Sequence, residues 1–461
     1  MTLIANDAQD PAEAEMDATS PSSGWQNWSG SLPPGTAPIV APQDMAQLKA
    51  VLADTKGPVR PVGSGHSWMP LVPADGVSAN SASHSGTYSD SGAVVRLDAF
   101  GGVVSVDAPN QCARLGAGGQ LKHLSPLLAA HGLAFRNLGD IDVQSLAGAT
   151  STATHGTGKT LPCLAAEIQG LTLLTANGDT LRIDATENAA LLPAAQVAMG
   201  ALGIITQMDM QLVACYKLHR RVQFRPIDEV LGAAMDLWET HRNFEFFYIP
   251  FSGTAMSITH DITDAADTPR DEDESDDAVM QLKALRDKLG WFPWARKKLL
   301  GAAISKAPEE NVIGDSWQLL SSARNVAFNE MEYHLPVENG LAALDEVRHY
   351  IERHRPDVFF PFECRMTAAD MSRLSSFHAG PCVSVAVHTH APDAYDFLFS
   401  DIEPILRRHG GRPHWGKLNS LDGADLAALY PKLADFAKLR RELDPQGRFL
   451  NRYLHGLFET A

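Results

Sequence analysis

Val62-Gly63-Ser64-Gly65-His66-Ser67-Trp68 is the stretch that decides the fold of this chain, and it continues the short strand-like segment Val59–Val62. Two glycines in a tight loop after a strand let several backbone N–H groups converge on one anion, as a pyrophosphate requires. The loop is neither the GxGxxG of a dinucleotide fold nor a P-loop, since no Lys-Ser/Thr follows at the required place. Taken alone, it fits an ordinary turn better.

A second stretch, residues 137–158, changes this balance. It reads Asn-Leu-Gly-Asp-Ile-Asp-Val-Gln-Ser-Leu-Ala-Gly-Ala up to position 149 and ends in Thr154-His155-Gly156-Thr157-Gly158. Such a long run of small residues without helical or strand period is costly in backbone entropy. Close approach of the backbone to a large planar ligand would account for it, whereas a tight turn would not need so long a run.

At these residues the chain resembles the vanillyl-alcohol-oxidase type of FAD-linked oxidoreductases, in the branch of the aldonolactone oxidases (D-arabinono-1,4-lactone and L-gulono-1,4-lactone oxidase) and alditol oxidases. Further matches keep the family's order over roughly residues 25–455: Asn27-Trp28-Ser29-Gly30, Gly200–Thr206, Glu330-Met331-Glu332-Tyr333, Glu363-Cys364-Arg365, Arg412–Lys417 and Phe449-Leu450-Asn451. The resemblance implies an α+β, two-domain FAD-binding fold of this type with a mixed-sheet substrate (cap) domain. We expect a disordered tail over 1–22, an FAD-binding domain over 23–215 and 428–461, and the cap over 216–427.

The resemblance further implies that FAD is held covalently, through a bond from the His66 ring to the 8α-methyl group of the isoalloxazine. A histidine in the loop that holds the pyrophosphate suits this role, and an exposed loop histidine is the alternative. The same comparison predicts which other residues line FAD: Gly63, Ser64, Gly65, Ser67, Gly139, Ser145, Gly148, Ser151, Ala153, His155 and Ile205.

On the substrate side, Glu363 and Arg365 are two residues apart at the end of a predicted strand, so both side chains point to one face. Val358, Phe360 and Phe362 should face the other way and pack. A structural salt bridge is the common role of such a pair. The resemblance implies a substrate clamp instead, in which the acid accepts sugar hydroxyls and the guanidinium polarises the reacting C–O group.

His388 and His390 alternate with Val383, Val385 and Val387, which predicts a buried valine face and two histidines on the more open face. Both histidines are candidates for taking the substrate's proton. A His-x-His pair also suits a metal, but no third ligand stands at convincing spacing, so we expect no metal site. Relatives that oxidise alditols carry a small hydroxyl residue at the position of His390, which points to a different substrate.

The resemblance implies roles for three further positions. Lys417 binds the reacting hydroxyl and the negative charge of reduced flavin, and Asp140 lies beside flavin and substrate, where alditol-oxidising relatives carry serine. Gly139 lies near the C4a edge of the flavin, where a bulkier residue would block oxygen. We therefore expect hydride transfer from a sugar-derived alcohol of the aldonolactone type to flavin N5, with oxygen as acceptor and hydrogen peroxide as product. An alditol oxidase, or a lactone dehydrogenase with another acceptor, is the alternative.

The chain has 461 residues and a formal net charge of −17, which argues against nucleic acid as a partner. Residues 261–279 hold nine acidic residues against one arginine, and we predict a solvated loop there. Five scattered cysteines, no secretion signal and no apolar run of membrane-spanning length predict a cytoplasmic protein without a membrane span. A non-catalytic FAD- or sugar-binding protein, or a metal-dependent hydrolase using His388, His390 and His414, are the readings from other functional classes.

Overall fold

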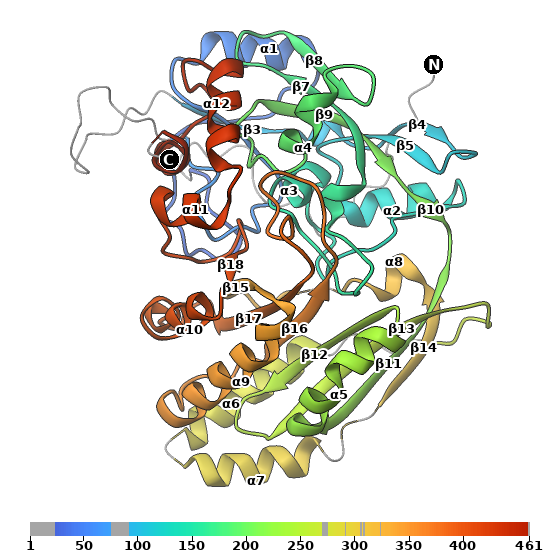
Figure 1. The fold of residues 1–461 in the computed structure, drawn as a ribbon, viewed down its shortest axis with the longest axis vertical. Helices are drawn as coiled ribbons and strands as arrows, with labels where there is room; N and C mark the ends of the chain where they lie inside the picture. The colour runs from blue at the N-terminus through green and yellow to red at the C-terminus, as the bar shows by residue number, and fades with distance from the viewer. Residues whose placement is uncertain are drawn as a thin grey trace.

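The computed structural model describes residues 24–74, 92–269, 275–290, 292–304, 307, 309–322 and 324–459. The predicted tail, residues 1–22, lies outside the described residues. Two bodies are stacked along the long axis of the molecule (Figure 1). The first is built from the N-terminal half of the chain and the C-terminal helices, and the second from the segment between them.

Three sheets make up the first body: a parallel sheet in the order β1-β3-β2, an antiparallel sheet in the order β4-β5-β9-β7-β8, and the pair β10-β6. Their bounds are β1 (Ile39–Val40), β2 (Val59–Val62), β3 (Ala93–Arg96), β4 (Val103–Asp107), β5 (Cys112–Gly116), β6 (Leu133–Ala134), β7 (Ile168–Leu174), β8 (Thr180–Asp184), β9 (Ile204–Gln211) and β10 (Val213–Ala214).

Helices from both ends of the chain share the core of this body, where Leu115 and Leu171 belong to the same buried cluster as Phe436 and Phe458. The helices are α1 (Met45–Asp54), α2 (Leu121–Ala129), α3 (Leu146–Ser151), α4 (Leu192–Ala195), α11 (Gly423–Leu429), α12 (Leu433–Leu443) and α13 (Arg452–Phe458), with short helical turns η2 (Asp98–Phe100), η3 (Leu164–Glu167) and η4 (Ala189–Leu191).

The second body is an eight-stranded sheet in the order β14-β11-β13-β12-β16-β17-β15-β18. Its strands are β11 (Lys217–Pro226), β12 (Asn243–Ile249), β13 (Thr254–Thr263), β14 (Glu310–Asp315), β15 (Phe328–Pro336), β16 (Phe362–Thr367), β17 (Cys382–His390) and β18 (Arg412–Pro413). Its helices are α5 (Ile227–Thr240), α6 (Ser275–Leu289), α7 (Pro293–Ile304), α8 (Ser316–Leu319), α9 (Val337–His354), η5 (Leu398–Ile402) and α10 (Glu403–Arg408). All its pairings between described strands are antiparallel, so the sheet is antiparallel rather than mixed.

This sheet consists of two units of the same order, β11-α5-β12-β13 and β15-α9-β16-β17, which meet where β12 pairs with β16. Each helix begins directly after a proline, Pro226 or Pro336, as suits a residue with a fixed φ and no N–H to donate. The apolar faces of both helices pack on the sheet, with Trp238 and Val347 in one buried cluster. The edge strands β12 and β16 of the two units thus become the two central strands of the eight-stranded sheet.

The strand-like segment Val59–Val62 is confirmed as β2, Met45–Asp54 forms the helix α1, and β7 and β8 form a hairpin around Asn177-Gly178. The strand that carries Glu363 and Arg365 was expected to include Val358 and Phe360, and this is wrong: pairing begins only at Phe362, directly after Pro361, whose nitrogen has no hydrogen for a ladder. Val358, Phe360 and Phe362 are nevertheless all buried in the core, as predicted.

The acidic run is not one solvated loop. Residues 261–263 complete β13, where Ile262 pairs with Leu218, and residues 275–279 begin α6. Asp276 and Asp277 lie in the first turn of that helix, where negative charge is favourable. Residues 270–274 of the run lie outside the described residues.

Candidate active site and cofactor groove

The loop Gly63–Ser67 leaves β2 and runs along one wall of a groove in the first body. An added Cβ at Gly63 would lie 2.1 Å from Ser145 Oγ, so a larger residue would displace the side chain that caps α3. Gly65 has φ +73, a backbone conformation that favours glycine. Ser64 Oγ donates a hydrogen bond to the carbonyl of Val143, so the two glycine-rich stretches of the sequence are in contact.

The groove is partly open to solvent. Nine of the residues predicted to line FAD line this groove: Gly63, Ser64, Gly65, His66, Ser67, Ser145, Gly148, Ser151 and Ile205. Gly139, Ala153 and His155 are outside this lining. Small side chains on both walls leave the backbone accessible to a flat ligand.

His66 has the features that a covalent flavin link requires. Its Nδ1 atom is buried and has no hydrogen-bond partner, and its ring lies 4.9 Å from the ring of Trp28. Burial, with the nearby charge of Lys417, lowers the pKa of His66 to about 4, so the ring is neutral and carries a free lone pair at neutral pH. A buried imidazole nitrogen without a partner fits attachment to a group placed in the groove.

Arg60 also lines the groove, although it was not among the residues predicted to do so. Its fully buried guanidinium donates to the carbonyls of Leu71, Met199 and Gly200 at 2.9, 2.7 and 3.0 Å. Burial lowers its pKa to about 9. A lone arginine in the apolar segment Val59–Val62 was the signal that could have shown a buried structural role.

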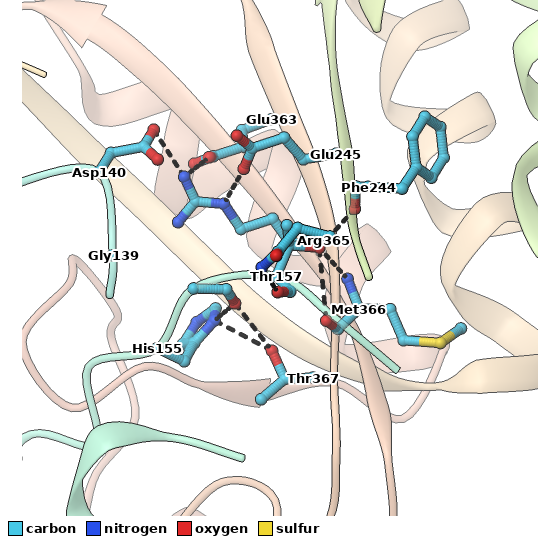
Figure 2. Close-up of polar contacts among 12 residues, drawn as sticks. Gly139, Asp140, His155, Thr157, Phe244, Glu245, Glu363, Arg365, Met366 and Thr367 are labelled. Carbon is cyan, nitrogen blue, oxygen red and sulfur yellow. Dashed lines mark hydrogen bonds and ion pairs between the residues drawn. The ribbon is translucent and has the colours of Figure 1, made fainter. Parts of the chain in front are cut away.

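Across from the groove, Arg365 on β16 holds three carboxylates (Figure 2). Its Nε donates to Glu245 at 2.6 Å, and its Nη2 contacts Asp140 at 2.6 Å and Glu363 more closely still. Glu245 stands on β12 directly opposite Arg365 in the ladder, so the two central strands of the sheet supply the guanidinium and two of the acids. The side chains of Arg365, Glu245 and Glu363 are at least nine-tenths buried, whereas that of Asp140 is 21% exposed.

The charges of this cluster are strongly perturbed. Burial, together with the charges of Asp140 and Glu245, raises the pKa of Glu363 well above its ordinary value despite Arg365. Burial also raises the pKa of Glu245. The opposite holds for Asp140, where Arg365 and Arg324 outweigh burial and lower the pKa. Asp140 is therefore the acid that stays charged, and Glu363 binds a proton most readily.

A second cluster surrounds Glu330 on β15. Its carboxylate forms an ion pair with Lys417 Nζ and lies 3.5 Å from His388 Nε2. Burial alone would raise the pKa of Glu330, but Lys417 and His388 hold it at about 2. Lys417 Nζ also lies 4.5 Å from the centre of the Trp68 ring, a cation–π contact with the residue that ends the His66 loop.

Glu363 joins the two clusters. Its carboxylate lies within 4.8 Å of ligand atoms of Glu330 and His388, and also of Asp140 and Glu245. The predicted substrate residues Glu363, Arg365, Lys417, His388 and Asp140 are thus brought into one buried site. Glu245 and Glu330 were missed as site residues, although each is a charged side chain within an otherwise apolar strand segment, and that was the available signal.

His390 is separated from this site. It lines a pocket at the surface with Ser29, Asn325 and Ala391, and its Nδ1 lies 3.8 Å from Asp393. His388 stays in the site, but its Nδ1 donates to the carbonyl of Pro361 at 2.9 Å while its Nε2 faces Glu330. Neither ring nitrogen of His388 is directed to a free space.

His155 lies below the cluster (Figure 2), where it connects the two bodies. Its Nε2 is 3.0 Å from Glu332 of β15, and its Nδ1 is 3.1 Å from Thr367 of β16. Gly139 is packed against the same residue, because a Cβ there would lie 3.0 Å from the carbonyl oxygen of His155. Ala153, with φ +60, is buried at the end of the same run.

The metal-hydrolase reading finds no support in the geometry. Within the described ranges, the side-chain groups close enough to share a metal ion are His155–Glu332–His334, Glu330–Glu363–His388 and Asp140–Glu245–Glu363. None of them joins His388 with His390 or His414. Within the same part of the chain, no helix has both the length and the apolar composition needed to cross a membrane.

Comparison with known proteins agrees with this geometry. Residues 208–457 match the family described as D-arabinono-1,4-lactone oxidase, and residues 36–184 match the FAD binding domain. The chain is similar to the L-gulono-1,4-lactone dehydrogenase of Mycobacterium tuberculosis, with 32% identity over 438 residues that cover 93% of this chain and 97% of that protein. It is also similar to the alditol oxidase of a Streptomyces species, with 29% identity over 450 residues, or 94% and 98% of the two chains.

Among solved structures, cholesterol oxidase from B. sterolicum has the same fold, with a TM-score of 0.75, 16% sequence identity and coverage of 95% of this chain and 96% of that one. At this identity the likeness concerns the fold alone. It confirms the predicted two-domain FAD-binding fold.

Proposed function

The chain belongs to the D-arabinono-1,4-lactone oxidase family and is an FAD-dependent oxidoreductase; from this premise we propose that it oxidises a neutral alcohol group of an aldonolactone-type substrate and passes the electrons to oxygen. We also propose that residues 23–215 with 428–461 form the FAD-binding domain and residues 216–427 the cap. A cytoplasmic location belongs to the same proposal, and the five cysteines are free thiols in the structure.

One observation carries this proposal: the amine of the cap lies against the loop that carries His66. The Trp68 N–H donates to the carbonyl of Gly416 at 2.8 Å, and Lys417 Nζ lies over the Trp68 ring. The acid, the guanidinium and the amine therefore surround a site next to the groove. A binding protein without catalytic function would not need three buried ionic groups at this place.

When bound, FAD supplies the hydride acceptor for alcohol oxidation. We propose that it lies in the groove between Gly63–Ser67 and Ser145–Ser151, with His66 Nδ1 as its covalent attachment atom. The unpartnered nitrogen and the glycine and serine residues that line both sides of the groove support this assignment.

We assign the proton of the reacting hydroxyl to Glu363. Its raised pKa brings the carboxylate closer to the range in which a general base works at neutral pH. His388 is less suited, because its Nδ1 already donates to Pro361 and its Nε2 faces Glu330. Arg365 and Lys417 then stabilise negative charge that develops on the substrate oxygen.

Oxygen as acceptor rests on the resemblance, which places Gly139, a residue without a side chain, near the flavin edge that oxygen must reach. The similarity to a protein named a dehydrogenase favours another acceptor. Two measurements test the proposal. A panel of 1,4-lactones and alditols should bleach the flavin absorbance under anaerobic conditions. Mixing the reduced protein with oxygen should then restore the absorbance and release hydrogen peroxide. Slow reoxidation by oxygen would favour a dehydrogenase that uses another acceptor. If no lactone or alditol of the panel bleached the flavin, the proposed substrate class would be refuted.

A further inference from the structure

We propose that this site selects neutral polyhydroxyl substrates and rejects those that carry a carboxylate, because Asp140, Glu245 and Glu363 already occupy the guanidinium of Arg365. Aldonates, the hydrolysed forms of the lactones, are the excluded class. The inference rests on the proposed function in taking Arg365 as a substrate contact, and it adds which charge the substrate has.

The hydrogen-bonding edges of Arg365 show why. A guanidinium binds a carboxylate strongly through two parallel N–H donors on one edge. The guanidinium has two such edges, one formed by Nε and Nη2 and the other by Nη1 and Nη2. Nη2 belongs to both edges and already contacts Asp140 and Glu363, and Nε donates to Glu245. The remaining nitrogen, Nη1, has no ion pair or hydrogen bond with the described residues and points away from the three acids (Figure 2). It can donate to a single neutral oxygen, such as a hydroxyl or a lactone carbonyl.

The other cations near the site are also engaged. Lys417 is paired with the buried Glu330, and Arg324 lies 3.6 Å from Asp140. Around Arg365, three carboxylates whose oxygens lie within 4.8 Å of one another face two guanidinium groups. An incoming carboxylate would therefore meet acids and no free cation, and like charges in a buried site repel strongly.

A neutral polyol faces the opposite situation. Its hydroxyl groups can donate to the carboxylates and accept from Nη1, so the surplus of acceptors becomes a set of partners. Asp140 contributes an acid at a position where, by the resemblance, alditol-oxidising relatives carry serine. Asp140 and Glu245 are therefore specificity-determining residues in this proposal.

The test compares an alditol, the aldonate of the same carbon chain and the 1,4-lactone, using the FAD-loaded protein. Binding of the aldonate is measured by its perturbation of the oxidised flavin spectrum and by its inhibition constant against lactone oxidation. We expect the aldonate to bind at least about tenfold more weakly than the alditol. Asp140→Asn and Glu245→Gln each keep the side-chain shape, and each should narrow this ratio by raising aldonate affinity.

Asp142→Asn is the matched control, because Asp142 is a carboxylate on the same loop as Asp140. Its basic neighbours are Lys122 and His123, not Arg365. It should leave the ratio unchanged. If Glu245→Gln does not fold, Asp140→Asn still decides, since Asp140 is partly exposed on a loop.

Equal affinity for aldonate and alditol in the unaltered protein, or a ratio that neither substitution moves, would overturn the charge selection. The proposed function would survive that result as long as lactone or alditol bleaches the flavin. Conversely, if none of the lactones and alditols bleaches the flavin, the proposed function is refuted. The perturbation of the oxidised flavin spectrum by the aldonate then still measures whether the site rejects anions.

Discussion

Replacing Lys417 by methionine should destabilise the protein and slow its chemistry for two separable reasons. Methionine keeps the length of the side chain but leaves Glu330 buried without its ion-pair partner. The pKa of Glu330 is held at about 2 instead of the ordinary 4.5, and at about 1.4 kcal/mol per pH unit this difference corresponds to about 3 kcal/mol. That value agrees with the cost of about 3–5 kcal/mol for removing one partner of a buried ion pair.

The pH dependence has a definite sign. A carboxylate whose pKa is lower in the folded state stabilises the fold above its ordinary pKa, and this contribution is lost as the pH falls towards the folded value. Without Lys417, however, burial acts on Glu330 without its main opposing charge and raises the pKa of the unpaired carboxyl above its ordinary value. The deficit of Lys417→Met should therefore shrink as the pH falls and be smaller at pH 4 than at pH 7. Urea unfolding of the variant and the unaltered protein at pH 7 and pH 4 measures this.

A second substitution separates stability from chemistry. In Lys417→Met/Glu330→Gln no unpaired charge is buried, so most of the lost unfolding free energy should return. Anaerobic reduction of the flavin by substrate should stay slow in both variants if Lys417 stabilises charge on the reacting oxygen. A Lys417→Met protein as stable as the unaltered one would refute the buried pair, and a double variant with normal flavin reduction would refute the chemical role.

The remaining predictions concern the flavin, oxygen and acid. His66→Ala should lose its yellow colour on acid precipitation because the flavin is no longer covalently bound; colour retained in the precipitate would contradict the assigned bond. Gly139→Ala, whose Cβ would lie 3.0 Å from the carbonyl of His155, should slow reoxidation by oxygen more than anaerobic reduction, and equal effects on both rates would argue against an oxygen path there. Burial lowers the pKa of His260 to about 3 and that of His414 to about 4. In the unfolded chain both histidines take up a proton near pH 6.5, whereas in the folded protein they do so only at a much lower pH. As the pH decreases from 6.5, the free energy of unfolding should therefore decrease by about 1.4 kcal/mol per pH unit for each of the two histidines. His260→Gln should flatten this slope in urea unfolding, and an unchanged slope would count against His260.

Local patterns were sufficient for much of the first body. The helix at 45–54 begins at an Asp44 cap, and the hairpin at 177–178 has an Asn-Gly turn, so short-range chemistry fixes both. The glycine loop was predictable for the same reason, since Gly63 packs against Ser145 of the second glycine-rich stretch and Gly65 has a positive φ. The resemblance to a family then supplied the cofactor.

The cap was harder because its organisation is non-local. The two β-α-β-β units have little sequence in common beyond a proline before each helix, at Pro226 and Pro336, and a Phe-Glu pair in each central strand. Only the pairing of β12 with β16 shows that Glu245 stands opposite Arg365. Sequence spacing placed Glu363 and Arg365 on one face correctly, yet it could not show that acids from two other segments share the same guanidinium.

His390 illustrates the limit of the alternation pattern. It continues the parity of Ser384, Ala386 and His388, so the sequence favoured a shared role for both histidines. The strand ends at His390, where the chain turns towards the surface pocket, and Asp393 rather than Glu330 becomes its neighbour. Parity along a strand fixes the face of a side chain, whereas the distance from the site depends on where the strand ends.

The position of the ionic groups explains why catalysis and the joining of the two bodies depend on the same residues. Gly416, the neighbour of Lys417, accepts the N–H of Trp68, and this contact links the first body to the second. A second link is the contact between His155 and Glu332 of β15. Burying Glu245, Glu363 and Glu330 in such a boundary is tolerable only while Arg365 and Lys417 are present. A substitution that removes one cation therefore weakens the contact between the bodies and the chemistry together, and only a compensating change at the paired acid can separate the two effects.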